Sequence, residues 1–272
     1  MAWALVTPSS RGIGAALTRH LLQTTPPTLP IVATARSSNL DAVRESLLAD
    51  IPSSSDNHSR LDVQRCDLLD EKSISDLASY CKDRYNDRSK SKSAHLRMAF
   101  CLPGMLVPEK APEKIEYDSA LDTLKLNLLA DMMLAKHFTP FLPKKSAQLD
   151  PIDGLPADKA VLAFMSARVG SISDNSLGGW YSYRASKAGV NQLVKSVDIY
   201  LKMRAEGKAM CVGLHPGTVK TELSREFWGG VQEGKLFSAE YSAERLVEVV
   251  NGLGVEEGRG RCWDWKGEEV PP

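Results

Sequence analysis

A tyrosine and a lysine four residues apart, Tyr183 and Lys187, are the residues of this chain best suited to acid–base chemistry. Residues spaced i and i+4 lie on one face of an α-helix, one turn apart. A free tyrosine titrates near pH ~10, and a nearby ammonium favours the phenolate and lowers that pKa. The spacing therefore predicts a proton-transferring tyrosine. By itself, however, such a pair is common on helix surfaces.

A glycine-containing turn near the N-terminus is suited to holding a phosphate. Residues 7–14 read Thr-Pro-Ser-Ser-Arg-Gly-Ile-Gly and follow a short apolar run. Gly12 and Gly14 let the backbone approach a pyrophosphate, and the N-terminus of a following helix offers free N–H groups and a positive dipole end. A tight strand-to-helix turn needs the same small residues, so this loop alone leaves both interpretations open.

Strand-like and helix-like segments alternate along the chain, which predicts how these groups are positioned. Apolar runs predict strands at residues 2–6, 31–35, 61–66, 96–102, 160–165, 209–214 and 261–265. Helical periodicity predicts helices at residues 14–23, 40–49, 74–83, 120–138, 182–202 and 243–251. Residues 143–159 carry prolines and charges and predict a surface insertion. The alternation predicts an α/β fold with a mainly parallel sheet, helices on both faces, and ligands at the carboxyl ends of the strands.

Composition excludes several classes of function. The chain has 272 residues, 43% of them hydrophobic, and its 34 basic and 34 acidic residues give no net charge. This is ordinary for one α/β domain and lacks the basic excess typical of nucleic-acid binding. Five cysteines with no C-x-x-C pair argue against a disulfide framework or a metal site. We expect a cytoplasmic protein with reduced thiols, no signal peptide and no membrane span, which needs about 20 apolar residues.

Taken together, the motifs resemble those of the short-chain dehydrogenase/reductase family, and most closely its C-factor and sniffer-like carbonyl reductase branch. The family's T-G-x-x-x-G-x-G motif matches residues 7–14 except at Pro8, and its acidic residue after the third strand matches Asp67. Its Y-x-x-x-K motif matches Tyr183 and Lys187, and its later P-G motif matches residues 215–221. The resemblance spans nearly the whole chain. It implies a single three-layer Rossmann domain with a doubly wound sheet, in which residues 1–140 mainly bind the cofactor and residues 160–272 carry the catalytic and substrate-binding groups.

The second predicted strand bears on the choice of cofactor. It is followed by Arg36 and Ser37, where enzymes that prefer NAD usually place a carboxylate for the ribose hydroxyls. A guanidinium suits a 2′-phosphate, and Arg11 adds a second positive charge, so the sequence favours NADP(H). By the resemblance, the residues expected to contact the cofactor are Thr7, Ser10, Arg11, Gly12, Ile13, Gly14, Arg36, Ser37, Asp67, Gly104, Asn127, Tyr183, Lys187, Pro216, Gly217, Val219 and Thr221.

The resemblance also implies catalytic roles. Tyr183 would donate a proton to a substrate carbonyl oxygen as hydride arrives from the nicotinamide. Lys187 would lower the pKa of Tyr183 and hold the nicotinamide ribose, while Asn127 would support a water-linked proton path. The family's catalytic serine is replaced by Ala167, and a missing donor at a developing oxyanion can cost roughly 3–4 kcal/mol. Three nearby serines, or none, could substitute for it: Ser166, Ser171 and Ser173.

Two further departures concern the cofactor loop and the central strands. Pro8 has no N–H and a fixed φ, so weaker or shifted cofactor binding is expected. Residues 101–104 read Cys-Leu-Pro-Gly where the family usually has N-N-A-G. Apolar packing is expected to replace the asparagine amides that brace those strands in the family.

We therefore expect an NADPH-dependent reductase of a carbonyl group on a small or medium apolar substrate. Residues 223–237 are apolar and glycine-containing, which suggests a substrate lid beside Trp180 and Tyr181. A helical hairpin packed on the core fits the same pattern.

Two other functions remain open: altered chemistry on the same fold, such as imine reduction or a non-redox step, and non-enzymatic NADP(H) binding or signalling. Many members of the family pair through long helices, so a homodimer or homotetramer through residues 120–138 and 182–202 is an option. Apolar residues there can equally belong to the core.

Overall fold

The computed structural model describes residues 2–52, 57–85 and 94–272. Its strands are β1 (Ala2–Thr7), β2 (Ile31–Ala35), β3 (Leu61–Arg65), β4 (His95–Cys101), β5 (Ala160–Met165), β6 (Ala209–His215), β7 (Thr218–Val219), β8 (Leu236–Phe237), β9 (Cys262–Asp264) and β10 (Glu269–Val270). Eight of them form one sheet in the order β10-β9-β6-β5-β4-β1-β2-β3, and β7 pairs with β8 separately. All neighbours in the large sheet are parallel except β9 and β10.

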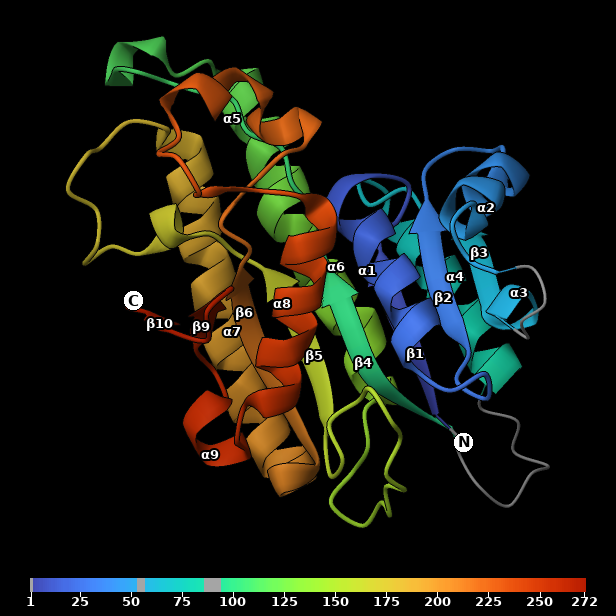
Figure 1. The fold of residues 1–272 in the computed structure, drawn as a ribbon. Helices are drawn as coiled ribbons and strands as arrows, with labels where there is room; N and C mark the ends of the chain where they lie inside the picture. The colour runs from blue at the N-terminus through green and yellow to red at the C-terminus, as the bar shows by residue number, and fades with distance from the viewer. Residues whose placement is uncertain (1, 53–56, 86–93) are drawn as a thin grey trace.

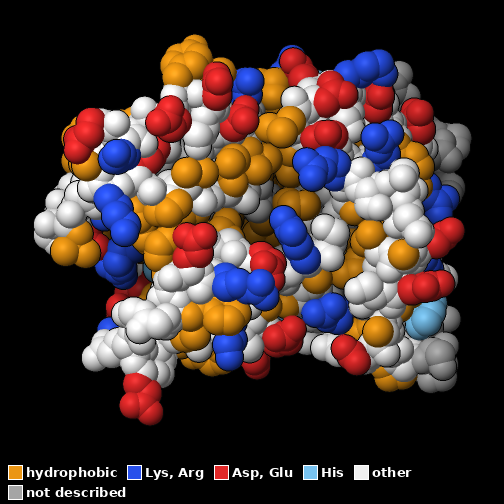
Figure 2. All heavy atoms as spheres, turned by 90° about the horizontal axis from the view of Figure 1, so that it is seen from above, with side chains coloured by type: hydrophobic (Ala, Val, Ile, Leu, Met, Phe, Trp, Pro, Cys, Tyr) orange, Lys and Arg blue, Asp and Glu red, His pale blue; other side chains and the backbone are white. Residues whose placement is uncertain are grey.

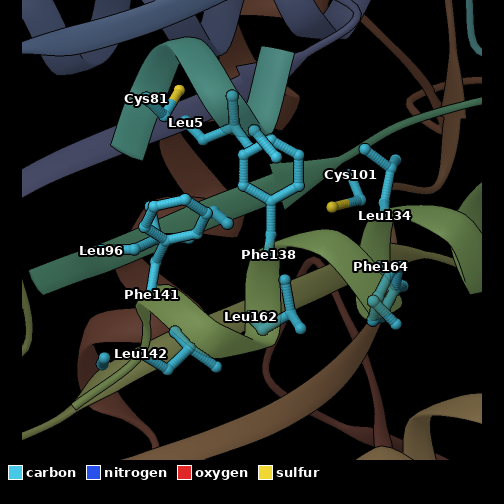
Figure 3. Packing of buried hydrophobic residues seen from close by; sticks show 14 of the residues in the cluster. Leu5, Cys81, Leu96, Cys101, Leu134, Phe138, Phe141, Leu142, Leu162 and Phe164 are labelled. Atoms are coloured by element: carbon cyan, nitrogen blue, oxygen red, sulfur yellow. The ribbon is translucent and has the colours of Figure 1, made fainter. Parts of the chain in front are cut away.

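Helices cover both faces of this sheet (Figure 1). They are α1 (Gly12–Thr24), α2 (Leu40–Leu48), α3 (Asn57–Arg60), α4 (Glu71–Tyr85), α5 (Tyr117–Leu124), α6 (Ala130–Phe138), α7 (Tyr181–Ala205), α8 (Ala239–Gly252) and α9 (Val255–Gly258). One core cluster joins the sheet to α1, α2 and α8. The other joins it to α4, α6 and α7, and Figure 3 shows Leu134, Phe138 and Phe164 meeting there. The predicted three-layer, doubly wound α/β fold is confirmed.

The strand order fixes where a ligand can bind. The chain runs outward from β1 to β3, crosses back to β4 beside β1, and continues outward in the other direction. At this switch point the connections after β1 and after β4 leave on opposite faces of the sheet, which opens a crevice at the carboxyl ends of the two strands. Both the glycine-containing loop and residues 102–104 lie at that edge.

The helix predicted at residues 120–138 contains a local irregularity. It begins earlier, at Tyr117, and runs through α5, a π-helical turn at Lys125–Leu129 and α6. In the π-helical turn the N–H of Ala130 bonds to the carbonyl of Lys125, one residue further back than in an α-helix. Such turns occur often at functional sites, and this one contains Asn127.

The insertion at residues 143–159 has no helix or strand, as expected, but it is not merely a surface loop. Arg97 lies on β4, is almost completely buried, and donates to the carbonyls of Asp150 and Pro156. Leu155 belongs to the core. A cavity of about 900 Å³ lies beside this segment, lined in part by His95 at the start of β4, so it is at the end of the sheet opposite the crevice.

Other expectations from composition can be compared with the described residues. All five cysteines are buried and free, and Cys101 packs in the core where the family has an asparagine, as expected. The described part of the chain contains no group of three or more His, Cys, Asp or Glu side chains that could hold a metal ion. Within it, no helix is long and apolar enough to cross a membrane.

Candidate active site

The carboxyl ends of the parallel strands form one face of the molecule, which Figure 2 shows from above. Apolar side chains line a hollow across this face, with lysine and arginine side chains beside it. The loops that end there follow β1, β4, β5 and β6. These loops, together with the first turns of α1 and α7, carry most of the residues predicted to bind the cofactor or to take part in catalysis.

The pair predicted to transfer protons lies on α7, as the four-residue spacing required. Tyr183 is 8% exposed and Lys187 is 2% exposed, so both are enclosed near the start of that helix. The Lys187 ammonium lies 5.9 Å from the centroid of the Tyr183 ring. It donates a hydrogen bond of 2.7 Å to the carbonyl of Met165 and one of 3.5 Å to that of Pro103. The lysine therefore joins α7 to the ends of β4 and β5.

The electrostatics of the tyrosine differ from the expectation based on spacing. We expected the lysine to lower the pKa of Tyr183, but burial raises the pKa of Tyr183 to about 12 in this structure. The phenolate loses its hydration inside the protein. The ammonium group is already engaged with backbone carbonyls. In this structure Tyr183 is therefore protonated at neutral pH and is a weaker acid than a free tyrosine.

Asn127 links the π-helical turn to the two segments around it. Its side chain accepts a hydrogen bond from the backbone N–H of Met105 (2.8 Å) and donates to the Met105 carbonyl (2.9 Å). It also donates to the Ser186 hydroxyl at 3.1 Å, next to Lys187 in sequence. Asn127 is fully buried. The structure thus brings Asn127, Tyr183 and Lys187 into one site.

Sequence reasoning missed a buried carboxyl group near the lysine. Asp131 lies one helical turn after Asn127, is completely buried, and neither of its carboxyl oxygens has a hydrogen-bond partner in the described structure. Burial raises the pKa of Asp131 well above its ordinary range, and the charge of Lys187 opposes this. Burial likewise lowers the pKa of Lys187, and Asp131 opposes that. The charge on each group therefore depends on the other.

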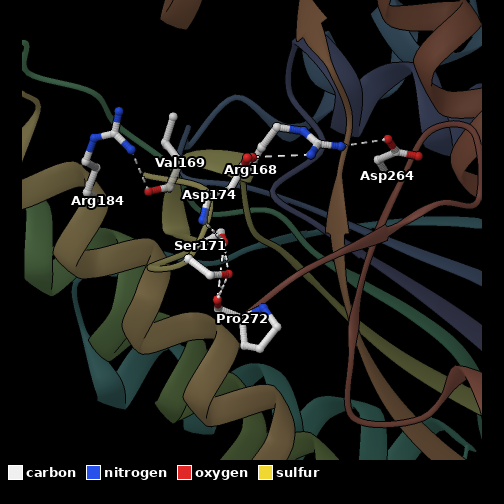
Figure 4. Close-up of polar contacts among 8 residues, drawn as sticks. Arg168, Val169, Ser171, Asp174, Arg184, Asp264 and Pro272 are labelled. Carbon is white, nitrogen blue, oxygen red and sulfur yellow. Dashed lines mark hydrogen bonds and ion pairs between the residues drawn. The ribbon is translucent and has the colours of Figure 1, made fainter. Parts of the chain in front are cut away.

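Each of the three candidate serines is hydrogen-bonded to a group other than Tyr183. The Ser166 hydroxyl donates to Oδ1 of Asn191 at 2.6 Å. Ser171 accepts from the N–H of Asp174 and donates to the carbonyl of Pro272, as Figure 4 shows. Ser173 also bonds to Pro272. In the described part of the chain, none of these hydroxyls bonds to Tyr183, and the position itself is Ala167.

The glycine-containing loop has the shape of a phosphate cradle. Gly12 has φ +56°, and a Cβ there would lie 3.2 Å from a methyl group of Thr221. A Cβ on Gly14 would lie 2.0 Å from the carbonyl oxygen of Pro8, so only glycine fits that position. The Thr7–Pro8 bond is cis. No acidic residue lies in the first turn of α1 and no side chain caps it, so the positive end of the helix dipole remains available to an anion.

The arginines predicted to bind a 2′-phosphate are exposed, and neither forms an ion pair with a described residue. Arg11 is the N-cap residue of α1, and Arg36 follows β2. Ser37 accepts a hydrogen bond from the N–H of Asn39. Asp67 follows β3, where its carboxylate accepts a bond from the N–H of Leu69 at 3.0 Å. These residues follow adjacent strands at the same edge of the sheet.

The later P-G motif, residues 215–221, lies against the glycine-containing loop. Val219 is buried and pairs in register with Phe237 across β7 and β8, and the Thr221 methyl group lies against Gly12. Gly217 has φ +76°, and a Cβ there would lie 2.7 Å from the Phe237 ring. Pro216 is buried and Gly104 is exposed at the end of β4. The two halves of the predicted cofactor site are therefore in contact.

An aromatic group covers the tyrosine. The Trp180 ring lies 6.2 Å from the Tyr183 ring in a T-shaped arrangement and 4.8 Å from the Phe227 ring. Phe227 belongs to a 3₁₀ helix, Glu222–Gly230. The predicted lid segment therefore lies beside the tyrosine through these aromatic contacts, and the alternative of a helical hairpin is wrong, since β8 follows that helix. Tyr181 has no ring contact with any residue that the structure describes.

A histidine in the later motif predicts how stability depends on pH. Burial is the main reason that the pKa of His215 is lowered from 6.5 to about 4. The unfolded chain binds this proton first, so the stability that neutral His215 contributes is present above about pH 6.5 and is lost as pH falls toward 4. We expect the wild type to lose up to about 3 kcal/mol more than His215→Gln over this range. Urea unfolding at several pH values, with His137→Gln on α6 as a control, would measure this. Parallel stability profiles for wild type and His215→Gln would contradict it.

The family model described as short chain dehydrogenase matches residues 2–230. Among curated proteins, the C-signal of Myxococcus xanthus is 38% identical over 110 residues, and this match covers 40% of the present chain but only 60% of that protein.

Two solved structures share the fold over nearly their full length. The carbonyl reductase Sniffer of D. melanogaster is 24% identical with a TM-score of 0.79, covering 100% of this chain and 98% of that one. A carbonyl reductase from chicken fatty liver, solved with NADPH bound, is 26% identical with a TM-score of 0.80, covering 99% of this chain and 98% of that one.

Proposed function

The chain belongs to the short chain dehydrogenase family, and we propose that it is an NADPH-dependent reductase of carbonyl groups on small or medium apolar substrates. The observation that carries the proposal is the site itself. Tyr183 and Lys187 lie enclosed on one helix, Asn127 is tied to the same helix through Ser186, and the glycine loop opens beside them. The NADPH bound to the chicken carbonyl reductase supports this choice of cofactor.

The residues of the glycine loop fit a dinucleotide. Gly12 and Gly14 leave the space in which a Cβ would stand, and the uncapped N-terminus of α1 faces an anion favourably. Arg11 and Arg36 would hold the 2′-phosphate, and Asp67 would lie near the adenine. Bound NADPH would supply the hydride that reduces the carbonyl carbon. In this proposal, residues 1–140 form the mainly cofactor-binding half and residues 160–272 form the catalytic and substrate-binding half.

The chain's own residues complete the reaction. The Tyr183 hydroxyl donates its proton to the carbonyl oxygen, so that a ketone or aldehyde leaves as an alcohol. Burial keeps that hydroxyl protonated until a substrate arrives. Lys187 stabilises the phenolate that remains after the transfer. Asn127 holds the π-helical turn against Met105. From this turn, a water-linked path returns a proton to Tyr183. The rings of Trp180 and Phe227 exclude water and favour apolar, especially aromatic, substrates.

The experiment that tests this function is NADPH oxidation with a panel of substrates. The panel contains apolar aliphatic ketones, aryl ketones, aldehydes and cyclic imines. We expect turnover with carbonyl compounds, and higher kcat/KM for aryl ketones than for aliphatic ketones of similar size. NADPH binding without turnover of any panel member would contradict the proposal.

Cofactor preference gives a separate prediction. Arg36→Ala should raise the Kd for NADPH about 10-fold to 100-fold, because a charge-assisted contact to the 2′-phosphate is lost, and should leave NADH binding nearly unchanged. Fluorescence titration of both cofactors would measure this. Arg84→Ala, an exposed arginine on α4, is the matched control. Equal Kd values for NADH and NADPH in the wild type would overturn the preference.

A second candidate function is favoured by one observation. The hydroxyls of Ser166, Ser171 and Ser173 bond to groups other than Tyr183. An iminium ion is already electrophilic and needs less help at the accepting atom. Imine turnover far above ketone turnover in the same panel would favour this alternative. A non-redox step or a signalling role without turnover is a weaker candidate, because the Tyr183, Lys187 and Asn127 arrangement is intact.

Location and assembly are also proposals. Five free, buried thiols support a cytoplasmic location. Exposed apolar side chains lie on the outer faces of the two long helices and support a homodimer or homotetramer formed through them: Leu124, Leu129, Met132, Ile199, Tyr200 and Met203.

A further inference from the structure

The segment after β4 links the two helices that carry the site. Met105 exchanges two hydrogen bonds with the side chain of Asn127. Four residues later, Glu109 is only 4% exposed and reaches the start of α7. Residues 105–109 are therefore hydrogen-bonded at one end to Asn127 and at the other end to the start of α7, which carries Tyr183.

Glu109 makes three hydrogen bonds to the residues just before the tyrosine. Its backbone carbonyl accepts from the N–H of Trp180 at 2.7 Å. Its carboxylate accepts from the N–H of Ser182 at 3.0 Å and from the Ser182 hydroxyl. Ser182 is buried and immediately precedes Tyr183. The buried carboxylate of Glu109 thus accepts two hydrogen bonds from the first turn of α7.

The first turn of α7 needs this acceptor because its own N-cap residue lacks one. An N-cap side chain such as Ser or Asp normally accepts from the N–H of the second or third helical residue. Trp180 occupies the N-cap, makes no such bond, and has the left-handed backbone conformation with φ 52° and ψ 46°. Without Glu109 the buried N–H of Ser182 would lack a partner. The carboxylate also complements the positive end of the helix dipole.

From these contacts we propose that Glu109 is a positioning residue that fixes Tyr183 and Trp180 through the first turn of α7. The inference rests on the proposed reductase function for its effect on rate. If the first turn frays, the Tyr183 ring leaves its position beside the Lys187 ammonium. At the same time the Trp180 ring loses its position between Tyr183 and Phe227. One carboxylate therefore sets both the proton donor and the aromatic wall of the substrate site.

The kinetic test compares Glu109→Ala with Glu109→Gln. A misplacement of about 1 Å can cost about 100-fold in rate, so we expect kcat of Glu109→Ala to fall about 10-fold to 100-fold with KM for NADPH nearly unchanged. The glutamine keeps a carbonyl oxygen for the N–H of Ser182, so Glu109→Gln should recover most of kcat. Glu113→Gln, an exposed carboxylate in the same loop, is the control. Wild-type kcat in Glu109→Ala would overturn the proposal.

A second measurement does not need turnover. The amide hydrogen-exchange rate of the peptide that covers residues 180–186 should rise in Glu109→Ala and rise by a smaller amount in Ser182→Ala. The exchange rate of α8 should stay as in the wild type in both variants. Unchanged exchange at residues 180–186 would overturn the proposal even if kcat falls. If the wild type turns over no substrate, the proposed reductase function fails, but the exchange experiment still decides whether Glu109 holds the start of α7.

Discussion

Tyr183→Phe should lower kcat for carbonyl reduction by about 10²-fold to 10⁴-fold, the range of a positioned general acid. The substitution removes only the hydroxyl that donates the proton, and among the described residues this hydroxyl has no hydrogen-bond partner. The fold and the cofactor site should therefore remain intact. Steady-state NADPH oxidation would give kcat, and a fluorescence titration would confirm that the Kd for NADPH changes by no more than a few fold.

Tyr117→Phe is the control for this experiment, because it removes an exposed tyrosine hydroxyl from α5 without touching the pair. It should keep wild-type kcat. If Tyr183→Phe reduced ketones as fast as the wild type, another group would have to protonate the product, and the proposed mechanism would be wrong.

Ala167→Ser should raise ketone turnover by up to about 10²-fold to 10³-fold, the value of one donor at a developing oxyanion. Ala167 follows β5 in an extended conformation with φ −156° and ψ 152°. Adjacent residues in extended backbone point to opposite sides. Since Ser166 faces Asn191 on α7, a new hydroxyl at residue 167 would point to the other side of the backbone, at the position where the family has its catalytic serine. Comparing kcat for aryl ketones between Ala167→Ser and the wild type would measure the gain.

The control for this gain is Ser166→Ala, which removes the neighbouring hydroxyl and its bond to Asn191. It should reduce stability but leave the turnover of the folded enzyme nearly unchanged. A gain for ketones without a gain for cyclic imines would show that the added donor acts on a carbonyl oxygen. No gain with either substrate would mean that the reaction does not need a donor at this position.

Much of the fold follows from local sequence pattern. The strands β2 and β5 have the predicted bounds, and the other long elements differ by a few residues at their ends. Period-two and 3.6-residue patterns record which face of a segment is buried, so they predict elements without knowledge of their partners. The irregular segments were harder. Nothing in the sequence between residues 120 and 138 marks a π-helical turn, and the role of Arg97 in anchoring residues 143–159 depends on distant carbonyls.

The sequence by itself determined the order of the elements, the glycine cradle and the tyrosine–lysine pair, because spacing along one helix or one loop fixes their geometry locally. Only the tertiary structure decided what surrounds them. It engaged Ser166, Ser171 and Ser173 elsewhere, raised the pKa of Tyr183 by burial, and brought Glu109 to the start of α7 from 73 positions away. Desolvation and hydrogen bonds between distant segments depend on how the chain packs, and no local pattern records them.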